Sequence, residues 1–373
     1  MGERAFLKSV PGQTRSIIME RKMKHFRFLS SLLGLGLLLA SLAPLSAQTT
    51  RLFTDSAGRT VVLPRTLDRI APSGPLAQIV LYSLAPESVI GWSSRLPQTV
   101  RAYMPARHWE KPLFGQFYGT GSATNLEALI AAAPQVIIDI GEAKPSIRED
   151  MDTLQHQTGI PVIFIEATLP TLAQAYRTLG ELTGLPQEAE ALAVFCERTL
   201  QTAAAISAAA AARPRSVYYG EGETGLNTNP AGSVHADVIP VVGARNVAEI
   251  PLGRGSGGNT ISIEQLMLWN PDVIILGPGS VYDSVRADPL WRDLAAVQAG
   301  RVYEIPTGPY NWMGRPPAAN RLIGIYWLAA IVYPEHFREE LAAVAREFYD
   351  LFYHYELSAE EISQLLSRSA GLR

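Results

Sequence analysis

The chain is poor in cysteine and histidine, and this excludes several kinds of site. Its 373 residues include one cysteine, Cys196, and six histidines. A single thiol forms no intramolecular disulfide, and we expect Cys196 to be a small buried hydrophobic residue. The histidines beyond residue 50 are scattered, without the paired spacing of metal ligands. They are His108, His156, His235, His336 and His354. We expect no resident metal, no cofactor and no capture of a bare transition-metal ion.

The chain also lacks a charge excess and a recognisable catalytic motif. Its net charge is −3, whereas a nucleic-acid partner would require a basic face. No G-x-S-x-G elbow or other nucleophile arrangement is present. Residues 253–258, GRGSGG, match the dinucleotide pattern, but the preceding residues form a poor strand and no suitable ribose-binding acid follows. These absences favour a binding protein over an enzyme.

Only one apolar run approaches the length of a membrane span, and it has the parts of a secretory signal. Residues 23–47 begin with Lys24 and Arg27, continue through an apolar stretch to Leu42, and end in Ser46 and Ala47. The run is shorter than the ~20 residues needed to cross a bilayer. We therefore predict cleavage near Ala47 and a soluble periplasmic product. Residues 1–22 fit no part of a signal, so we place the start of translation at Met23.

One long helix is predicted over residues 187–213. Pro186 suits a first helical turn and Pro214 ends the run. Good helix formers lie between them, with an apolar face at helical spacing. That face consists of Leu192, Phe195, Cys196, Thr199, Leu200, Ala203 and Ile206. At 1.5 Å per residue the helix would be roughly 40 Å long, enough to cross a small domain.

A repeated sequence motif flanks this helix, with one copy on either side of it. Residues 125–138, NLEALIAAAPQVII, align with residues 262–275, SIEQLMLWNPDVII. Glu127 then matches Glu264, and Pro134 matches Pro271. Each copy predicts a short helix, a break at the proline and a buried strand. We infer two similar α/β halves, residues 48–186 and 214–373, joined by the helix, with the C-terminal helices belonging to the second half.

Other elements follow from hydrophobic patterning and turn residues. In the first half we expect a hairpin turning at residues 55–58 and strands at residues 88–92, 135–141 and 161–166. In the second half we expect strands at residues 216–220 and 301–305 and helices at residues 234–242, 318–332 and 338–354. Ser358 to Glu361 forms a capping box. Strands that alternate with helices predict parallel sheets, with ligand-binding loops at the carboxyl ends of the strands.

Those loops are rich in aromatic and arginine side chains, which suit a flat or bulky anionic ligand. Glu142 and Glu221 are the clearest of the few carboxylates there, and the glycine-rich segment with Ser256 offers backbone N–H groups. The candidate ligand-binding residues are Trp92, Arg95, Tyr118, Glu142, Tyr219, Arg254, Ser256, Tyr310, Trp312 and Arg315.

In its repeat, its single long helix and its terminal motifs, the chain resembles the helical-backbone class (class III) of periplasmic substrate-binding proteins. They serve ABC importers of ferric siderophores, haem, cobalamin and, in one branch, molybdate or tungstate. The likeness spans about residues 50–335 and rests on TDSAGRTVVLP…DRIA, both copies of the repeat, the single long helix, and LWRDLAAVQAGRVYEIP. The resemblance implies two Rossmann-like lobes joined by a stiff helix, with the ligand cleft between them. It also implies that Glu127 and Glu264 dock on arginines of a permease dimer.

The sequence does not identify the ligand. Aromatic and arginine side chains together favour a metal chelate of ferric siderophore, haem or corrinoid type. Arg315 and the glycine-rich N–H groups leave molybdate or tungstate as the alternative. A remoter alternative is an envelope enzyme related to the nitrogenase-like fold, but those relatives use cluster-ligating cysteines and this chain has only Cys196. We expect a monomer that binds without turnover.

Overall fold

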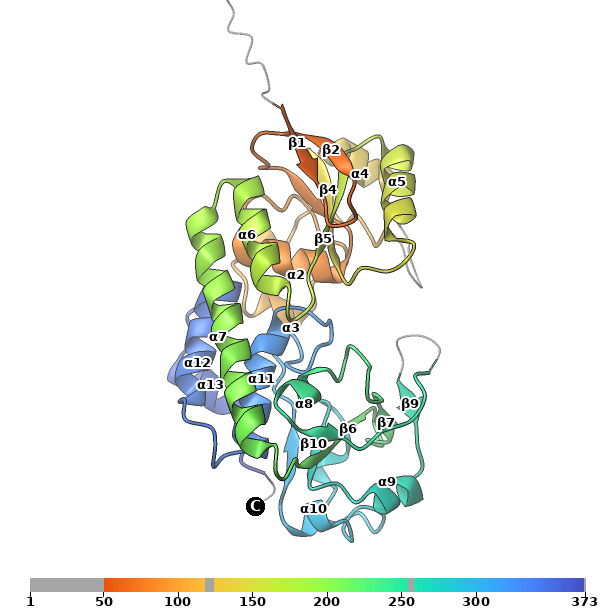
Figure 1. The fold of residues 1–373 in the computed structure, drawn as a ribbon, viewed down its shortest axis with the longest axis vertical. Helices are drawn as coiled ribbons and strands as arrows, with labels where there is room; N and C mark the ends of the chain where they lie inside the picture. Colours follow the sequence, from red (N-terminus) through yellow and green to blue (C-terminus); the bar gives the residue numbers. More distant parts are fainter. Residues whose placement is uncertain (1–49, 118–123, 254–257, 372–373) are drawn as a thin grey trace, which may run out of the picture. The chain divides into compact units, whose positions relative to one another are not determined.

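In the computed structural model, which describes residues 50–117, 124–253 and 258–371, one long helix separates two β-sheets along the chain (Figure 1). The described residues belong to the unit Thr50–Arg373. The predicted signal region and the start at Met23 lie outside them. No helix in the described ranges is long and apolar enough to cross a membrane.

The first sheet is parallel, with β4 (Val136–Gly141) between β3 (Ile70–Pro72) and β5 (Val162–Glu166). All six residues of β4 are apolar, glycine or a hydrogen-bonded aspartate, as expected of a strand covered on both faces. The chain passes through α2 (Pro75–Leu84), α3 (Gln98–Arg101), η1 (Ala106–His108) and α4 (Leu126–Ala132) before β4, and through α5 (Ile147–Thr158) before β5.

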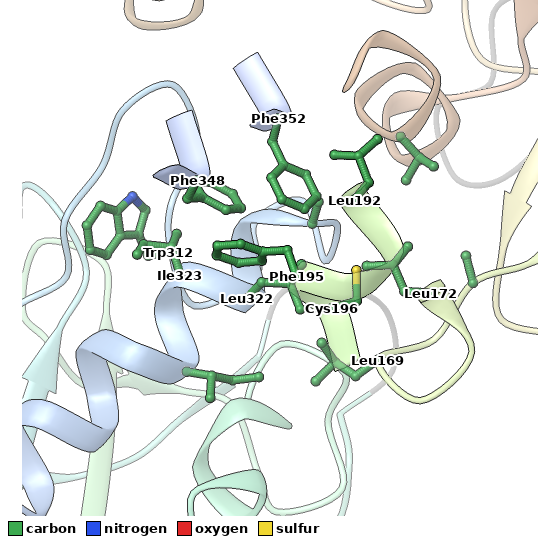
Figure 2. Close-up of a cluster of buried hydrophobic side chains, with 14 of the residues drawn as sticks. Leu169, Leu172, Leu192, Phe195, Cys196, Trp312, Leu322, Ile323, Phe348 and Phe352 are labelled. Carbon is green, nitrogen blue, oxygen red and sulfur yellow. The ribbon is translucent and has the colours of Figure 1, made fainter. Parts of the chain in front are cut away.

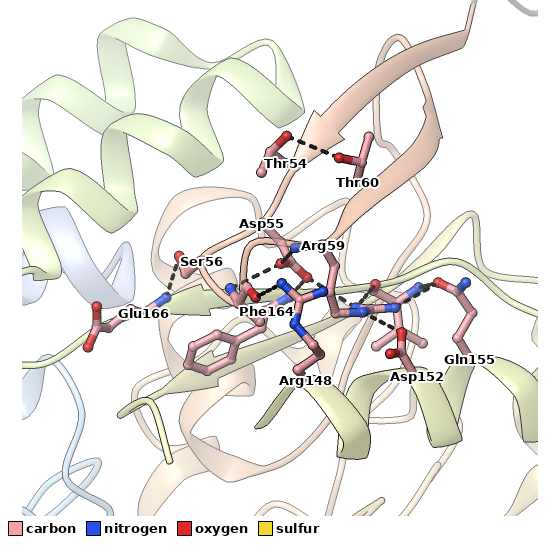
Figure 3. A network of polar contacts seen from close by, with 12 residues as sticks. Thr54, Asp55, Ser56, Arg59, Thr60, Arg148, Asp152, Gln155, Phe164 and Glu166 are labelled. Atoms are coloured by element: carbon pink, nitrogen blue, oxygen red, sulfur yellow. Dashed lines mark hydrogen bonds and ion pairs between the residues drawn. The ribbon is translucent and has the colours of Figure 1, made fainter. Parts of the chain in front are cut away.

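The predicted hairpin precedes this sheet and covers its edge. Strands β1 (Thr50–Thr54) and β2 (Thr60–Pro64) pair antiparallel. The turn between them lies along β5, where the Ser56 N–H donates to Phe164 O at 2.9 Å and the Phe164 N–H donates to Asp55 Oδ2 at 3.2 Å. Arg59 donates to Asp55 Oδ2 and to Val162 O, at 3.1 and 2.8 Å (Figure 3). Backbone and side-chain groups of the turn therefore bond to β5 where a further strand would pair.

The predicted strand at residues 88–92 is wrong. Val89 forms a single parallel bridge with Ile70, and Trp92 forms one with Leu113. At Gly91 the backbone passes directly over the Phe114 ring, so close that a Cβ there would lie 2.2 Å from the ring. The segment bends around Phe114 and leaves the sheet after one bridge.

The second sheet is mixed, which corrects the prediction of parallel strands alone. Its order is β11-β10-β6-β7-β9, and β8 also pairs with β6. The three core strands β6, β10 and β11 are parallel, whereas β7 pairs antiparallel with both β6 and β9. The strands are β6 (Ser216–Glu221), β7 (Asn227–Thr228), β8 (Arg245–Asn246), β9 (Asn259–Thr260), β10 (Val273–Leu276) and β11 (Val302–Glu304). Gly222 and Gly225, both at positive φ, turn the chain back as β7.

The repeat is present in the structure as predicted. Helices α4 and α9 (Ile263–Trp269) each begin after a residue whose side-chain oxygen accepts from the N–H three positions on, Asn125 and Ser262. Each ends in a left-handed residue, Ala133 or Asn270, before the proline and the strand. The two copies therefore share caps, length and exit geometry.

The linking helix α7 spans Pro186–Ala210 and ends three residues before the predicted limit. Its predicted apolar face is buried, except that Leu200 is half-buried. Phe195 packs against Phe348 and Phe352 of α12 at 5.8 and 5.3 Å between ring centroids (Figure 2). Cys196 is fully buried on this face, and burial raises the pKa of its thiol.

The remaining helices surround α7 and the second sheet. Helix α6 (Leu172–Thr183), which the sequence analysis does not identify, packs along α7. The predicted helix at 234–242 is reduced to α8 (Val238–Val241), because the preceding residues form turns. Helices α10 (Ala295–Gln298), α11 (Asn320–Val332), α12 (Leu341–Tyr353) and α13 (Ala359–Leu365) follow, with the short η2 (Val281–Asp283). The capping box at Ser358 is confirmed.

Helix α12 contacts both halves of the chain. It packs on α11 and α7, and also on α2 of the first half. The Tyr82 hydroxyl donates to Tyr353 O at 3.4 Å, and the Tyr103 and Tyr349 rings lie 5.3 Å apart. The C-terminal helices thus help to join the two halves.

Candidate ligand-binding site

Loops from both halves enclose a chamber of about 390 Å³, which we call the central chamber. The first half contributes Pro75 at the start of α2 and Arg95 from the loop after Trp92. The second half contributes Tyr310 and Arg315 from the segment between β11 and α11. The chamber thus unites three predicted ligand-binding residues that are far apart in the sequence.

Arg315 is held in place by a carboxylate at the carboxyl end of β6. Its Nε donates to Glu221 Oε1 at 2.6 Å and one terminal nitrogen donates to Glu221 Oε2 at 2.7 Å. The same nitrogen donates to Asn229 Oδ1 at 3.2 Å. This bidentate geometry fixes the plane of the guanidinium, whose side chain is still 33% exposed.

Glu221 is in turn surrounded by donors. The Tyr219 hydroxyl donates to Oε1 at 2.7 Å and Asn229 Nδ2 donates to Oε2 at 2.8 Å. Burial opposes ionisation of the carboxyl, but hydrogen bonds from Arg315, Tyr219 and Asn229 outweigh it and lower its pKa below the ordinary value. Glu221 is therefore ionised at neutral pH, and both of its carboxylate oxygens accept hydrogen bonds that orient Arg315.

Arg95 has a different environment. Its side chain is exposed, and within the described residues it has no ion-pair partner. No Asp or Glu is among the described residues that line the central chamber. With Arg315 compensated by Glu221, Arg95 leaves the chamber with a net positive charge.

Tyr310 supplies an aromatic wall to the same chamber. Burial raises its pKa to about 12, and a hydrogen bond with Gln78 opposes this rise. The oxygen of the Gln78 side chain accepts from the N–H and the hydroxyl of Ser93, at 2.9 and 3.0 Å. A buried glutamine of α2 thus connects the loop that carries Arg95 to the segment that carries Tyr310.

The segment from Thr307 to Arg315 is folded around Asn311. Asn311 forms antiparallel bridges with both Thr307 and Arg315, and its side-chain oxygen accepts from the Met313 N–H at 2.7 Å. The segment lies against α11 at Gly324, where a Cβ would be 1.9 Å from Trp312 O. Only glycine permits this close approach.

Glu142 lines a second chamber of about 440 Å³, also enclosed by both halves. This chamber contains an ion pair between Arg321, which is buried, and Asp237, which is half-buried. Burial raises the pKa of Asp237, and Arg321 opposes the rise. Glu142 lines this second chamber, whereas Arg95 and Arg315 line the central chamber, and no described residue lines both.

Three predicted aromatic residues do not face either chamber. Trp92, Tyr219 and Trp312 are at most 1% exposed. Trp92 donates from Nε1 to His108 O at 2.7 Å, and Trp312 lies in the cluster around Phe195 (Figure 2). Their rings belong to the main hydrophobic core, where burial of large aromatic side chains contributes strongly to stability. Tyr219 influences the chamber from behind its wall, through its hydrogen bond to Glu221.

The remaining predicted ligand residues, Tyr118, Arg254 and Ser256, lie outside the described residues. The structure adds residues that the sequence analysis did not select: Gln78, Asn229, Asp237, Asn311 and Arg321. Single polar residues inside apolar helices, such as Gln78 in α2 and Arg321 in α11, were the available signal. In the described ranges, no group of three or more His, Cys, Asp or Glu side chains is arranged to hold a metal ion.

The predicted docking residues lie on the surface. Glu127 and Glu264 each occupy the second position of their helices, α4 and α9, and both are exposed. Hydrogen bonds from its own backbone N–H and from Ser262 hold the pKa of Glu264 below the ordinary value. Within the described residues neither carboxylate has an ion-pair partner.

The family model described as periplasmic binding protein matches residues 109–308, more than half of the chain. The chain belongs to the periplasmic binding protein family. No curated protein matches it.

Solved structures agree with this family. An ABC transporter solute-binding protein from Sulfurospirillum deleyianum is 29% identical, with a TM-score of 0.76, over 85% of this chain and 99% of the other. A periplasmic solute-binding protein from Veillonella parvula is 24% identical, with a TM-score of 0.71, over 86% and 99%. The molybdate-bound MolA of Haemophilus influenzae is 20% identical, with a TM-score of 0.63, over 83% and 99%. The last two proteins share only 24% and 20% of their residues with this periplasmic binding protein, so their similarity shows a common fold and nothing more.

Proposed function

We propose that this periplasmic binding protein captures a negatively charged metal chelate, of ferric siderophore, haem or corrinoid type, and delivers it to an ABC importer. The observation that carries the proposal is the central chamber, where guanidinium groups from both halves converge and no described carboxylate lines the wall. A ligand that contacts Arg95 and Arg315 together bridges the two halves, as a solute-binding protein requires.

Charge supports an anionic ligand. Because Glu221 already orients Arg315, little side-chain conformational entropy is lost when a ligand oxygen binds the guanidinium. Arg95 is exposed and uncompensated in the described residues. Peripheral carboxylates or catecholates of a chelate accept charge-assisted hydrogen bonds from both side chains.

Size favours a chelate over molybdate or tungstate. The central chamber, at about 390 Å³, is within the range of ordinary small-molecule sites and far larger than a tetrahedral oxyanion. The chamber has less aromatic surface than the sequence predicts, because Trp92, Tyr219 and Trp312 are buried in the core. The proposal therefore depends on charge and volume, with Tyr310 as the aromatic contact.

A titration of the apoprotein tests the ligand class. Ferric siderophores, haem, cobalamin and molybdate are added in turn while tryptophan fluorescence is followed. We expect a chelate to bind stoichiometrically and without turnover. Arg95→Ala should weaken that chelate by about 1.5–3 kcal/mol without changing the free energy of unfolding. Arg65→Ala, at an exposed arginine that lines neither chamber, is the matched control. Binding of molybdate alone would overturn the chelate proposal.

The permease partner is the second part of the proposal. Equivalent helices that present Glu127 and Glu264 in the two halves suit a dimer whose subunits offer the same cationic site. The double change Glu127→Ala and Glu264→Ala should abolish stimulation of the importer while ligand affinity stays the same. Glu188→Ala, at an exposed glutamate in the first turn of α7, serves as control. Full transport by the double variant would contradict the docking assignment.

The exported form is the third part. A signal cleaved near Ala47 would release a monomer into the periplasm, with its N-terminus just before β1 at Thr50. Mass spectrometry of the purified periplasmic protein measures that N-terminus directly. Recovery of the protein in membranes with residues 30–45 intact would contradict it.

A further inference from the structure

His235 connects the turn before α8 to the segment that carries Arg315. Its Nδ1 lies 2.8 Å from Gly314 O, the carbonyl of the residue just before Arg315. Because a carbonyl oxygen only accepts hydrogen bonds, Nδ1 carries the hydrogen and donates it, which leaves Nε2 as the nitrogen that can take up a proton. The half-buried His235 ring is thus tied to the backbone that leads into a candidate ligand-binding side chain.

Gly314 is also packed closely against α11. Its φ is 115°, and a Cβ there would lie 3.1 Å from Cδ of Arg321. Arg321 is itself buried, and it forms an ion pair with Asp237, two residues after His235. The hydrogen bond from His235 and the close packing on Arg321 therefore fix the backbone just before Arg315.

Charges of both signs act on the His235 ring from the surrounding elements. Burial is the main cause that lowers its pKa below the ordinary 6.5, and the hydrogen bond to Gly314 O opposes this effect. The positive charges of Arg315 and Arg321 lower the pKa further, whereas the negative charge of Glu221 raises it. The ring is therefore neutral at neutral pH, and the charge of Arg315 is one of the reasons.

We propose that His235 is a positioning residue, which holds the Arg315 segment through Gly314 and takes up a proton when an anion binds to Arg315. The hydrogen bond from Nδ1 remains when Nε2 is protonated, so the ring can change its charge without releasing the segment. This inference rests on the proposed function and adds a pH dependence to its anion site.

The direction of the pH dependence follows from the charges. An anion on Arg315 offsets the positive charge that disfavours protonation of His235, so the pKa of the ring is higher in the complex than in the free protein. The complex then binds more protons than the free protein. Affinity for the anion therefore increases as the pH falls through the range between the two pKa values.

Titration with a gallium(III) tris-catecholate, the diamagnetic analogue of a ferric chelate, tests this inference. His235→Asn keeps an N–H near the position of Nδ1 but does not titrate. It should match the wild-type affinity within about twofold at about pH 8. The ratio of wild-type to His235→Asn affinity should rise about threefold by about pH 5.5. Both proteins meet the same chelate, so protonation of the chelate itself cancels from this ratio.

Two further measurements separate positioning from titration. His235→Leu removes the donor and should weaken binding about fivefold at both pH values, the effect of one net hydrogen bond. In NMR spectra of the wild-type protein, the ring C–H signals of His235 should titrate at a higher pH with the chelate bound than without it. The loss of these signals in either variant identifies them.

His336→Asn is the matched control, because His336 is a half-buried histidine of the second half that lines neither chamber. It should keep the wild-type affinity and pH response, and thermal melting should show all variants folded. Equal pH responses in the wild type and His235→Asn would overturn the inference while leaving the proposed function intact. If a variant fails to fold, an NMR titration that the chelate leaves unchanged overturns the inference by itself. Failure of the wild-type protein to bind the chelate at either pH would overturn the proposed function and this inference with it.

Discussion

The helix–strand units α4–β4 and α9–β10 have the same local structure in different surroundings. Both helices have a side-chain cap, a left-handed end and a proline before the strand. Strand β10 lies inside a sheet that continues through β6 to β7 and β9, whereas the sheet around β4 stops at β5. The repeated sequence motif thus determines the helix–strand unit. The neighbouring segments determine how many further strands each sheet has.

The edge of β5 shows what replaces the missing strands. Asp55 accepts hydrogen bonds from the N–H groups of Ala57, Arg59 and Phe164, and the Arg59 side chain closes the network (Figure 3). In the second half, backbone pairing of β6 with β7 and β8 does the same work. The edge of the first sheet therefore depends mainly on the side chains of Asp55 and Arg59, with one backbone hydrogen bond from Ser56, whereas the second depends on backbone pairing.

The largest difference between the halves should appear when Arg59 is removed. Arg59→Ala leaves the Asp55 carboxylate, whose side chain is fully buried, without its counter-ion. Loss of one partner of a buried pair costs about 3–5 kcal/mol, and urea denaturation measures the change in the free energy of unfolding. Arg177→Ala is the control, because its partners Glu190 and Glu197 are exposed. Equal losses in the two variants would refute the special role of the turn.

A smaller loss should follow from Gly324→Ala in the second half. The new methyl group would meet Trp312 O, and overpacking of this kind costs about 1–3 kcal/mol. The segment that carries Tyr310 and Arg315 must shift, so chelate affinity should fall as well. Gly74→Ala is the stability control, since nothing lies within 4 Å of its Cβ position. Unaltered stability and affinity would mean that the segment adjusts freely.

The two helix caps test the equivalence of the repeat directly. Asn125→Ala and Ser262→Ala each remove one side-chain hydrogen bond at a helix start. Each should cost about 1 kcal/mol in the free energy of unfolding. Similar values are expected because both caps are exposed and accept from the equivalent N–H. A large effect at one position alone would show that the copies differ in energy as well as in surroundings.

The smallest effect concerns pH and belongs to the second half. Because the folded state lowers the pKa of Glu221 below its ordinary 4.5, this carboxylate stabilises the protein above that pH and loses its contribution as the pH falls below it. Glu221→Gln should therefore flatten the acid loss of stability. Burial raises the pKa of Asp237, so Asp237→Asn should have the opposite effect. Urea denaturation at a series of pH values measures both slopes.

Residues with a local signal were predicted well. The capping box at Ser358, the hairpin turn and the apolar face of α7 all express preferences that act within a few residues. The strand at 88–92 failed because the Phe114 ring, more than twenty positions later, bends the backbone at Gly91. No residue within the segment itself indicates that contact.

The candidate site divides in the same way. Arg95, Tyr310 and Arg315 were selected because their loops follow strands, and the structure brings them together. Trp92 and Trp312 occupy similar loops but turn into the core. Loop position alone does not reveal which way a side chain points, because that depends on which apolar surface is available to cover it.

The sequence by itself therefore determined the two α/β halves, the linking helix and the repeated unit, because periodicity, caps and prolines act locally. Only the tertiary structure decided that Glu221 orients Arg315, that Glu142 belongs to a separate chamber, and that the aromatic rings serve the core. These outcomes depend on contacts between residues tens to hundreds of positions apart. Burial and charge compensation, which arise only when those segments meet, decide them.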